Sequence, residues 1–168
     1  NIIQQRPGMQ RLLKSALELL AETSQAERGV IMLCGESEDK LEPASVFVRD
    51  PLLSERQFII SQTIVDRCIN ERIGILSTDA TTDSRFSGSD SIFQQQVHSA
   101  ICVPLMIRTR LLGVCYLDRV QGLTVFRNSD LDFVSNLSSQ LALAIENLRM
   151  MRELTPVNPQ PPTRLAKL

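Results

Sequence analysis

The chain has 168 residues, 43% hydrophobic and 22% charged, which is ordinary for one globular domain. Its 18 basic and 19 acidic side chains leave a net charge of −1, which argues against nucleic acid or an anionic membrane as a partner. No apolar run approaches the roughly 20 residues of a membrane-spanning helix, and no signal peptide begins the chain. We therefore expect a cytoplasmic protein.

The first predicted element is a helix after Pro7, a residue that suits a first helical turn. Its apolar residues form a stripe wider than one core face needs, so we expect part of it to meet a partner chain. Two strands follow in the prediction. Arg28–Cys34 is a continuous apolar run typical of a central strand, and Ala44–Arg49 alternates as a half-buried strand does.

A second helix is predicted after Ser61, whose side chain we expect to cap it. Gly74 is expected to end this helix in the left-handed conformation that helix termini favour. A third short strand then begins at Ile75 and Leu76.

The segment 77–98 breaks this pattern, because it is polar and rich in Ser, Thr and Asp. Compact domains rarely keep so long a connection without structure or a use for it. One interpretation is a lid over a pocket, which brings hydroxyl groups and Arg85 to a polar ligand. The other is a surface excursion held down by Phe86 and Phe93. The sequence leaves both open.

The centre of the chain is a predicted β-hairpin. Two apolar runs, Ala100–Ile107 and Leu111–Leu117, are separated by the polar residues 108–110, which suit an exposed turn. Pro104 has no N–H for the strand ladder, so we expect it at a bulge or bend. The rest of the chain is expected to pack on this hairpin.

The last helix is predicted to begin at a Ser129 cap and to run to about Glu153, with Asp130 and Asp132 in its first turn. Apolar residues recur along it at heptad spacing. We favour the interpretation that they form a dimer seam; the alternative is that the stripe packs on the chain's own sheet. The predicted seam residues are Val134, Leu137, Leu141, Ala144, Leu148 and Met151.

The expected organisation has three parts. Residues 1–25 form an N-terminal linker and dimerisation helix, 26–154 the domain, and 155–168 a Pro-rich linker to a downstream region. Because the chain begins at Asn1 rather than Met, we expect a piece of a longer protein that carries an effector domain.

The four cysteines lie in apolar runs or on an amphipathic face, and none is in a CxxC pair. We expect buried, reduced thiols rather than a zinc site or a disulfide framework. They are Cys34, Cys68, Cys102 and Cys115. With His98 as the single histidine, no nucleophilic triad can be built, so we expect no catalytic residue, no metal and no enzyme activity.

Several stretches in combination carry a family resemblance. They are ERGVIML at 27–33, ILSTDATTDSRFSG at 75–88, SAICVPL at 99–105, LLGVCYLDR at 111–119, and F-x-x-x-D with its helix from Phe126. Over about residues 10–152 the chain resembles a GAF domain, of the kind found in bacterial signalling proteins and joined to FHA domains or nucleotide cyclases.

The resemblance implies an α+β fold with a twisted antiparallel sheet. It implies that the N- and C-terminal helices pack on one face and that a ligand pocket lies under a lid on the other. It also implies parallel homodimers built on the terminal helices, in agreement with the seam that the heptad spacing predicts.

Family members that bind cyclic nucleotides carry the pattern N-K-x-F-x-x-x-D-E. Here Phe126 and Asp130 are kept and Arg119 replaces the Lys, but Asp118 and Leu131 replace the Asn and the final Glu. We expect Arg119 and Asp130 to pair, and a cyclic nucleotide or another small polar ligand is the implied class. A bilin is not expected, because His98 has no neighbouring Cys, and a lone His is poor support for haem.

By lid position and family analogy, five residues are expected to line the pocket, with Arg85 meeting an anion and Phe86 and Ile92 covering an apolar part of the ligand. The five are Arg85, Phe86, Ser91, Ile92 and Ser99.

Three functions remain open at this stage. The favoured one is a regulatory module in which ligand binding shifts the packing of the terminal helices of a homodimer and so controls an effector. The second is a dimerisation module with a vestigial pocket. The third is a methionine sulfoxide reductase of the same fold, which would need accessible thiols of low pKa.

Overall fold

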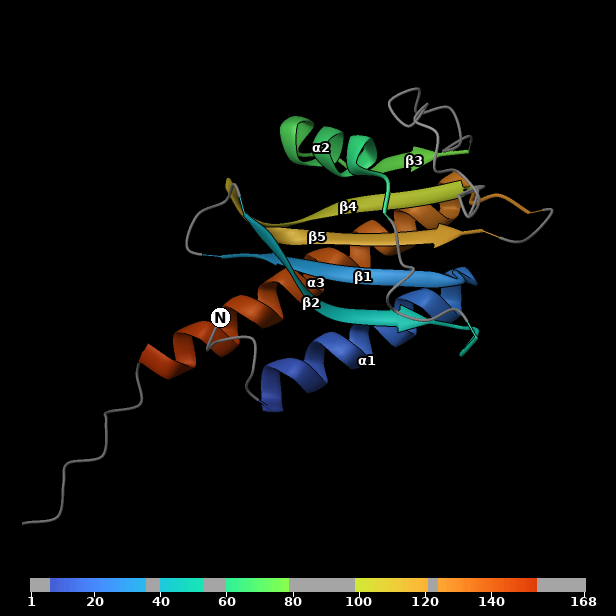
Figure 1. The fold of residues 1–168 in the computed structure, drawn as a ribbon. Coiled ribbons are helices and arrows are strands. Elements are labelled where there is room, and N and C mark those ends of the chain that lie inside the picture. Colours follow the sequence, from blue (N-terminus) through green and yellow to red (C-terminus); the bar gives the residue numbers. More distant parts are fainter. Residues whose placement is uncertain (1–6, 36–39, 53–59, 79–98, 121–123, 154–168) are drawn as a thin grey trace, which may run out of the picture.

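The structure is a computed structural model and describes residues 7–35, 40–52, 60–78, 99–120 and 124–153. Five strands form one antiparallel sheet in the order β2-β1-β5-β4-β3 (Figure 1). The strands are β1 (Arg28–Cys34), β2 (Leu41–Val48), β3 (Ile75–Ser77), β4 (Ser99–Ile107) and β5 (Arg110–Arg119).

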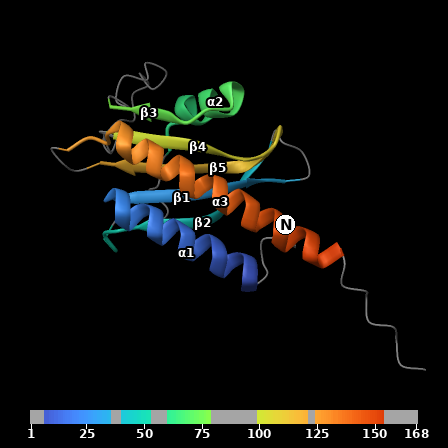
Figure 2. The same cartoon turned by 180° about the vertical axis from the view of Figure 1, so that it is seen from behind.

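Three helices cover the two faces of this sheet. They are α1 (Pro7–Ser24), α2 (Gln62–Glu71) and α3 (Asn128–Glu153). The helices α1 and α3 lie side by side and run in opposite directions on one face, and α2 lies on the other (Figures 1 and 2). The predicted α+β architecture, with both terminal helices on one face, is confirmed.

The predicted central hairpin is confirmed, with a tighter turn than expected. Strands β4 and β5 are joined by two residues, of which Arg108 has a φ of 54°. The bulge lies near the expected place but not at the proline: Pro104 pairs with Val114, and the register shifts between Leu105 and Met106. The shift leaves Leu112 of β5 as the extra residue.

Because side chains of a strand alternate between its faces, each face of the sheet has its own apolar core. On the α1–α3 face, β1 and β5 contribute buried residues such as Ile31, Cys115 and Leu117. On the α2 face they contribute Val30, Met32, Val114 and Tyr116, which pack with Val65 and Cys68 of α2.

The ends of α2 differ from the prediction. Ser61 occupies the N-cap position, but its side chain makes no capping hydrogen bond. The left-handed residue at the C-terminus is Arg72, with a φ of 56°, so the prediction for Gly74 is wrong. Gly74 instead allows α3 to approach, because a Cβ there would lie 3.0 Å from Leu131 Cδ1 and 3.2 Å from Ser135 Oγ.

The start of α3 also differs. The Arg127 carbonyl accepts the first helical hydrogen bond, from the Leu131 N–H, and the Asp130 carboxylate accepts one from the Arg127 N–H at 2.7 Å. Arg127 is therefore the cap, and the prediction for Ser129, which lies inside the helix, is wrong. The end of α3 at Glu153 is as predicted.

A pair of glycine substitutions tests the packing of β5 on β1. A Cβ at Gly113 would lie 2.0 Å from the Met32 carbonyl oxygen and 2.9 Å from Leu33 Cα, so the backbones themselves would have to separate. We expect Gly113→Ala to lower the free energy of unfolding by about 3 kcal/mol, measured by urea denaturation. Gly8→Ala is the control: a Cβ there meets nothing within 4 Å. It should leave stability unchanged or raise it by up to about 1 kcal/mol, and equal losses from both would contradict the packing.

Candidate ligand-binding face

Four of the five predicted pocket residues, Arg85, Phe86, Ser91 and Ile92, lie outside the described residues. The fifth, Ser99, begins β4 and is fully buried. Its hydroxyl donates to the Ser77 carbonyl and accepts from the Phe126 N–H, both at 3.0 Å. Ser99 thus links β3, β4 and the segment that enters α3, and its contact with a ligand stays a prediction.

The described part of the face opposite the terminal helices carries a buried ion pair. Arg28 and Asp118 lie opposite each other on β1 and β5. Arg28 Nε lies 2.8 Å from Asp118 Oδ1, and Arg28 Nη2 lies 2.7 Å from Oδ2. The two side chains are 2% and 0% exposed. This is a two-point, fully desolvated contact, the strongest geometry open to these groups.

Tyr116 extends this cluster along the same face of β5. Its hydroxyl accepts the Ser61 N–H at 3.3 Å, which ties the start of α2 to the sheet. Burial raises the pKa of Asp118 above its usual value, while Arg28 and a hydrogen bond from Tyr116 act in the opposite direction. Burial also raises the pKa of Tyr116, so its hydroxyl keeps its proton and remains a donor.

Sequence reasoning placed Arg28 in a strand and Asp118 directly after one, at the Asn position of the cyclic-nucleotide pattern, and it did not predict that the two would pair. The available signal was a charge at the end of an apolar run, at the start of RGVIMLC and at the end of LLGVCYLD. Charged side chains are almost never fully buried unless paired. That signal predicts a partner for each but cannot name it, because the β1–β5 register is a property of the folded sheet.

The cysteine prediction is confirmed, because all four thiols are free and buried. A hydrogen bond with Cys68 and burial raise the pKa of Cys102, and burial raises the pKa of Cys115 to about 12. Reactive cysteines need exposure and a lowered pKa, so these thiols do not suit reductase chemistry.

The expected pair between Arg119 and Asp130 is wrong. Arg119 donates to the carbonyls of Ser24, at 2.6 Å, and Val125, at 3.2 Å. Its guanidinium also lies over the ring of Phe126, 4.3 Å from the centroid. The Asp130 carboxylate instead accepts the N–H of Arg127, the N-cap residue of α3. The Arg and Phe of the motif therefore stabilise the junction between the terminal helices.

Some of the predicted seam residues pack on the chain's own sheet, and others lie on the surface of α3. Val134 and Leu141, 0% and 3% exposed, belong to the chain's own core, so for them the packing alternative is correct. Leu137 and Leu148 are partly buried against this core, and Ala144 is partly buried. Met151 is 67% exposed and is joined on the outer surface of α3 by Leu143 and Met150, 57% and 54% exposed.

The family model described as "GAF domain" matches residues 8–145, most of the chain. The chain belongs to the GAF domain family. Solved GAF domains share its architecture. The second GAF domain of DevS from Mycobacterium smegmatis has a TM-score of 0.65 at 15% identity, with 86% of this chain and 98% of that chain covered.

Two more structures are similar at this level. A methyl-accepting chemotaxis protein segment, residues 122 to 287, has a TM-score of 0.70 at 18% identity, covering 91% of this chain and 98% of that chain. A GAF domain/HD domain protein from Geobacter sulfurreducens has a TM-score of 0.64 at 15% identity, covering 84% and 94%. At these identities the likeness is one of fold.

A curated relative is also a signalling protein. The hybrid signal transduction histidine kinase G of Dictyostelium discoideum is 26% identical over 76 residues, which make up 45% of this chain and 2% of that protein. GAF domains are regulatory and sensory domains, typically without catalytic activity of their own. In the described part of this one, no helix is long and apolar enough to cross a membrane.

A double-mutant cycle tests the buried pair. Arg28→Met and Asp118→Asn should each lower the free energy of unfolding by about 3–5 kcal/mol, because each leaves a buried partner unpaired. The double variant should lose at least about 1 kcal/mol less than the sum of the two losses. Glu22→Gln is the control, since it breaks the exposed pair with Arg49 and should cost less than about 1 kcal/mol. Strictly additive losses would argue against coupling.

Proposed function

We propose that this GAF domain is a small-molecule sensor of a signalling protein, in which a ligand on the α2 side of the sheet changes how the terminal helices pack. The observation that carries the proposal is the buried Arg28–Asp118 pair at the end of β1 and β5. At this end of the sheet the chain passes from α1 into β1 and from β5 towards α3.

The coupling follows from the alternation of β5. Asp118 points to the α2 side, and the next residue, Arg119, points to the helices and holds the end of α1 at Ser24. The same guanidinium stacks on Phe126, two residues before α3 begins. A ligand that moves Asp118 therefore moves the residue that contacts both helices.

Glu27, the residue before β1, supports this link. Its N–H donates to the Asp118 carbonyl at 3.0 Å, and its carboxylate accepts from the Val120 N–H at 3.1 Å. The two strand ends therefore move as one unit.

The ligand class that we propose is a cyclic nucleotide or another small polar molecule with an anionic group. Arg85, Phe86, Ser91, Ile92 and Ser99 remain the proposed contacts; of these, Ser99 lies on the terminal-helix side of β4, opposite Arg119, whereas the Arg28–Asp118 pair lies on the α2 side. A dimerisation module without a ligand is the second candidate, and the exposed apolar side chains of α3 favour it.

Both candidates include a homodimer on the terminal helices, with the effector in the same full-length chain. The described surface of α3 supplies three exposed apolar residues, and α1 supplies Leu19, which is 51% exposed. Apolar side chains in one layer favour association with a second copy.

Glutamates on the outer surface of α3 test this dimer. We expect Leu143→Glu with Met150→Glu to convert a dimer into a monomer by light scattering at micromolar protein concentration, because charge on an apolar interface must be desolvated. The fold should survive, since both side chains are more than half exposed. Leu52→Glu, at a site 89% exposed in a turn, is the matched control and should stay dimeric. A double variant that keeps the dimer mass would contradict a dimer interface on the outer surface of α3.

Thermal unfolding with cyclic AMP and cyclic GMP tests the sensor. A ligand at about 100 times its dissociation constant adds about 2.7 kcal/mol, which raises Tm by about 5–10 °C for a domain of this size. Whichever of cyclic AMP and cyclic GMP is the ligand should raise Tm by this amount. A change of less than about 1 °C with both would retire cyclic nucleotides, and it would leave other small polar molecules and the dimerisation module.

A further inference from the structure

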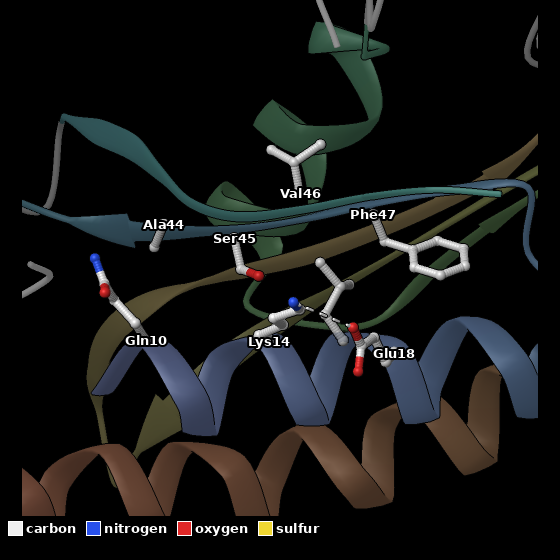
Figure 3. Close-up of a pocket in the computed structure, with 8 residues that line it drawn as sticks. Gln10, Lys14, Glu18, Ala44, Ser45, Val46 and Phe47 are labelled. Atoms are coloured by element: carbon white, nitrogen blue, oxygen red, sulfur yellow. Dashed lines mark ion pairs between the residues drawn. The ribbon is translucent and has the colours of Figure 1, made fainter. Parts of the chain in front are cut away.

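A groove lies between α1 and β2, the strand at the edge of the sheet (Figure 3). Its volume is about 240 Å³. The residues that line it are Gln10, Lys14, Leu17 and Glu18 of α1 and Ala44, Ser45, Val46 and Phe47 of β2. Within the described residues, β2 pairs with β1 only, so its outer backbone groups face this opening.

The first half of the outer edge of β2 is unable to pair with another strand. Pro43 has no N–H to donate, and the register with β1 shifts so that Ala44 is an extra residue between Pro43 and Ser45. Proline and bulges are devices that keep edge strands from pairing. They leave Ser45–Val48 as the stretch of β2 that is able to add a strand.

Two side-chain features lie level with this open stretch. Val46 is 38% exposed, and it is the one strand residue among the exposed large hydrophobic side chains of the described chain. On α1, Lys14 lies beside Ser45 and Glu18 beside Phe47 (Figure 3). Their side chains are 74% and 51% exposed and 4.0 Å apart, an exposed pair that is able to exchange partners at little cost.

We propose that this edge pairs with the same edge of a second copy of the chain, around a twofold axis at Val46. The two β2 strands run antiparallel, and Val46 meets Val46 of the second copy. Lys14 then lies opposite Glu18 of the second copy, and Glu18 lies opposite its Lys14. An interface of this kind uses the same surface on both copies and must be self-complementary, and this edge has Val46 on the side of β2 away from α1 and the two charges on α1, each in the order that a twofold axis requires (Figure 3).

The spacings agree with a common axis. Four residues of helix, from Lys14 to Glu18, rise about 6 Å, and two residues of strand, from Ser45 to Phe47, rise about 6.8 Å. The midpoint of each pair therefore falls at the level of Val46. Helices packed side by side lie about 8–10 Å apart, a separation that a lysine and a glutamate side chain span together.

Charge exchange tests the interface in a background that removes the proposed α3 dimer, Leu143→Glu with Met150→Glu. Lys14→Glu, or Glu18→Lys, places like charges opposite each other twice. Sedimentation equilibrium should show that either variant alone associates about tenfold more weakly than the background, a change of about 1.4 kcal/mol. An equimolar mixture of the two variants should associate at least as strongly as the background, because each then meets its opposite.

Val46→Lys is the third variant; it places two like charges on the axis, and a mixture with either of the other two variants cannot restore its association. It should abolish the remaining association, while circular dichroism shows an unchanged fold. A background that is monomeric up to millimolar concentration would overturn the edge pairing and leave the α3 dimer and the sensor untouched. An association constant that is unchanged by all three substitutions would overturn the edge pairing as well.

Discussion

The strand β5 is paired along both edges, with β1 on one side and β4 on the other, and Leu111–Arg119 are all buried. A strand in this position must satisfy every backbone group within the sheet, and it must supply apolar side chains to both faces. The α1–α3 core and the α2 core are therefore built on the same few residues. Little can change on one face of β5 without a change on the other.

The buried pair at the end of this strand is costly in isolation. Removal of two charges from water costs several kcal/mol per ion, and an apolar pair of similar size is often as stable. Arg28 and Asp118 offset part of this cost through two short hydrogen bonds, and Tyr116 contributes a third to the carboxylate. A buried pair of this kind is weak evidence for added stability, and this one lies on the face opposite the terminal helices, where we propose the ligand.

Sequence reasoning worked where a local pattern decides the structure. Arg28–Cys34 is recognisable as a central strand because both of its faces are covered, and such a strand is a continuous apolar run. The errors arose where tertiary contacts decide. Ser61 and Ser129 are good caps by residue type, but Ser61 lies where its N–H meets Tyr116, and α3 begins one residue before Ser129. Gly74 suits a helix end, yet space for α3 is what requires it.

Dependence on tertiary contacts also explains which residues of the candidate site and the dimer seam the sequence did not predict. A heptad stripe on α3 looks alike whether it faces a partner or its own sheet, because both surfaces are apolar with nearly the same period. Val134 and Leu141 face the sheet, whereas Leu143 and Met150, which lie outside the predicted seam, are exposed together with Met151. The Arg28–Asp118 pair joins positions 90 residues apart, so only the strand register brings it together.

The helix α1 borders both of the surfaces that we propose as contacts between copies of the chain. It packs on β1 and β2, it lies against α3, and its last residue is held by Arg119 of β5. Its outer side also borders the groove at the β2 edge. A rotation of α1 would therefore alter the surface shared with α3 and the spacing of Lys14 and Glu18 against β2 together. A ligand that acted on the end of β5 as we propose would change both proposed contacts between copies through one helix, with no separate pathway to each.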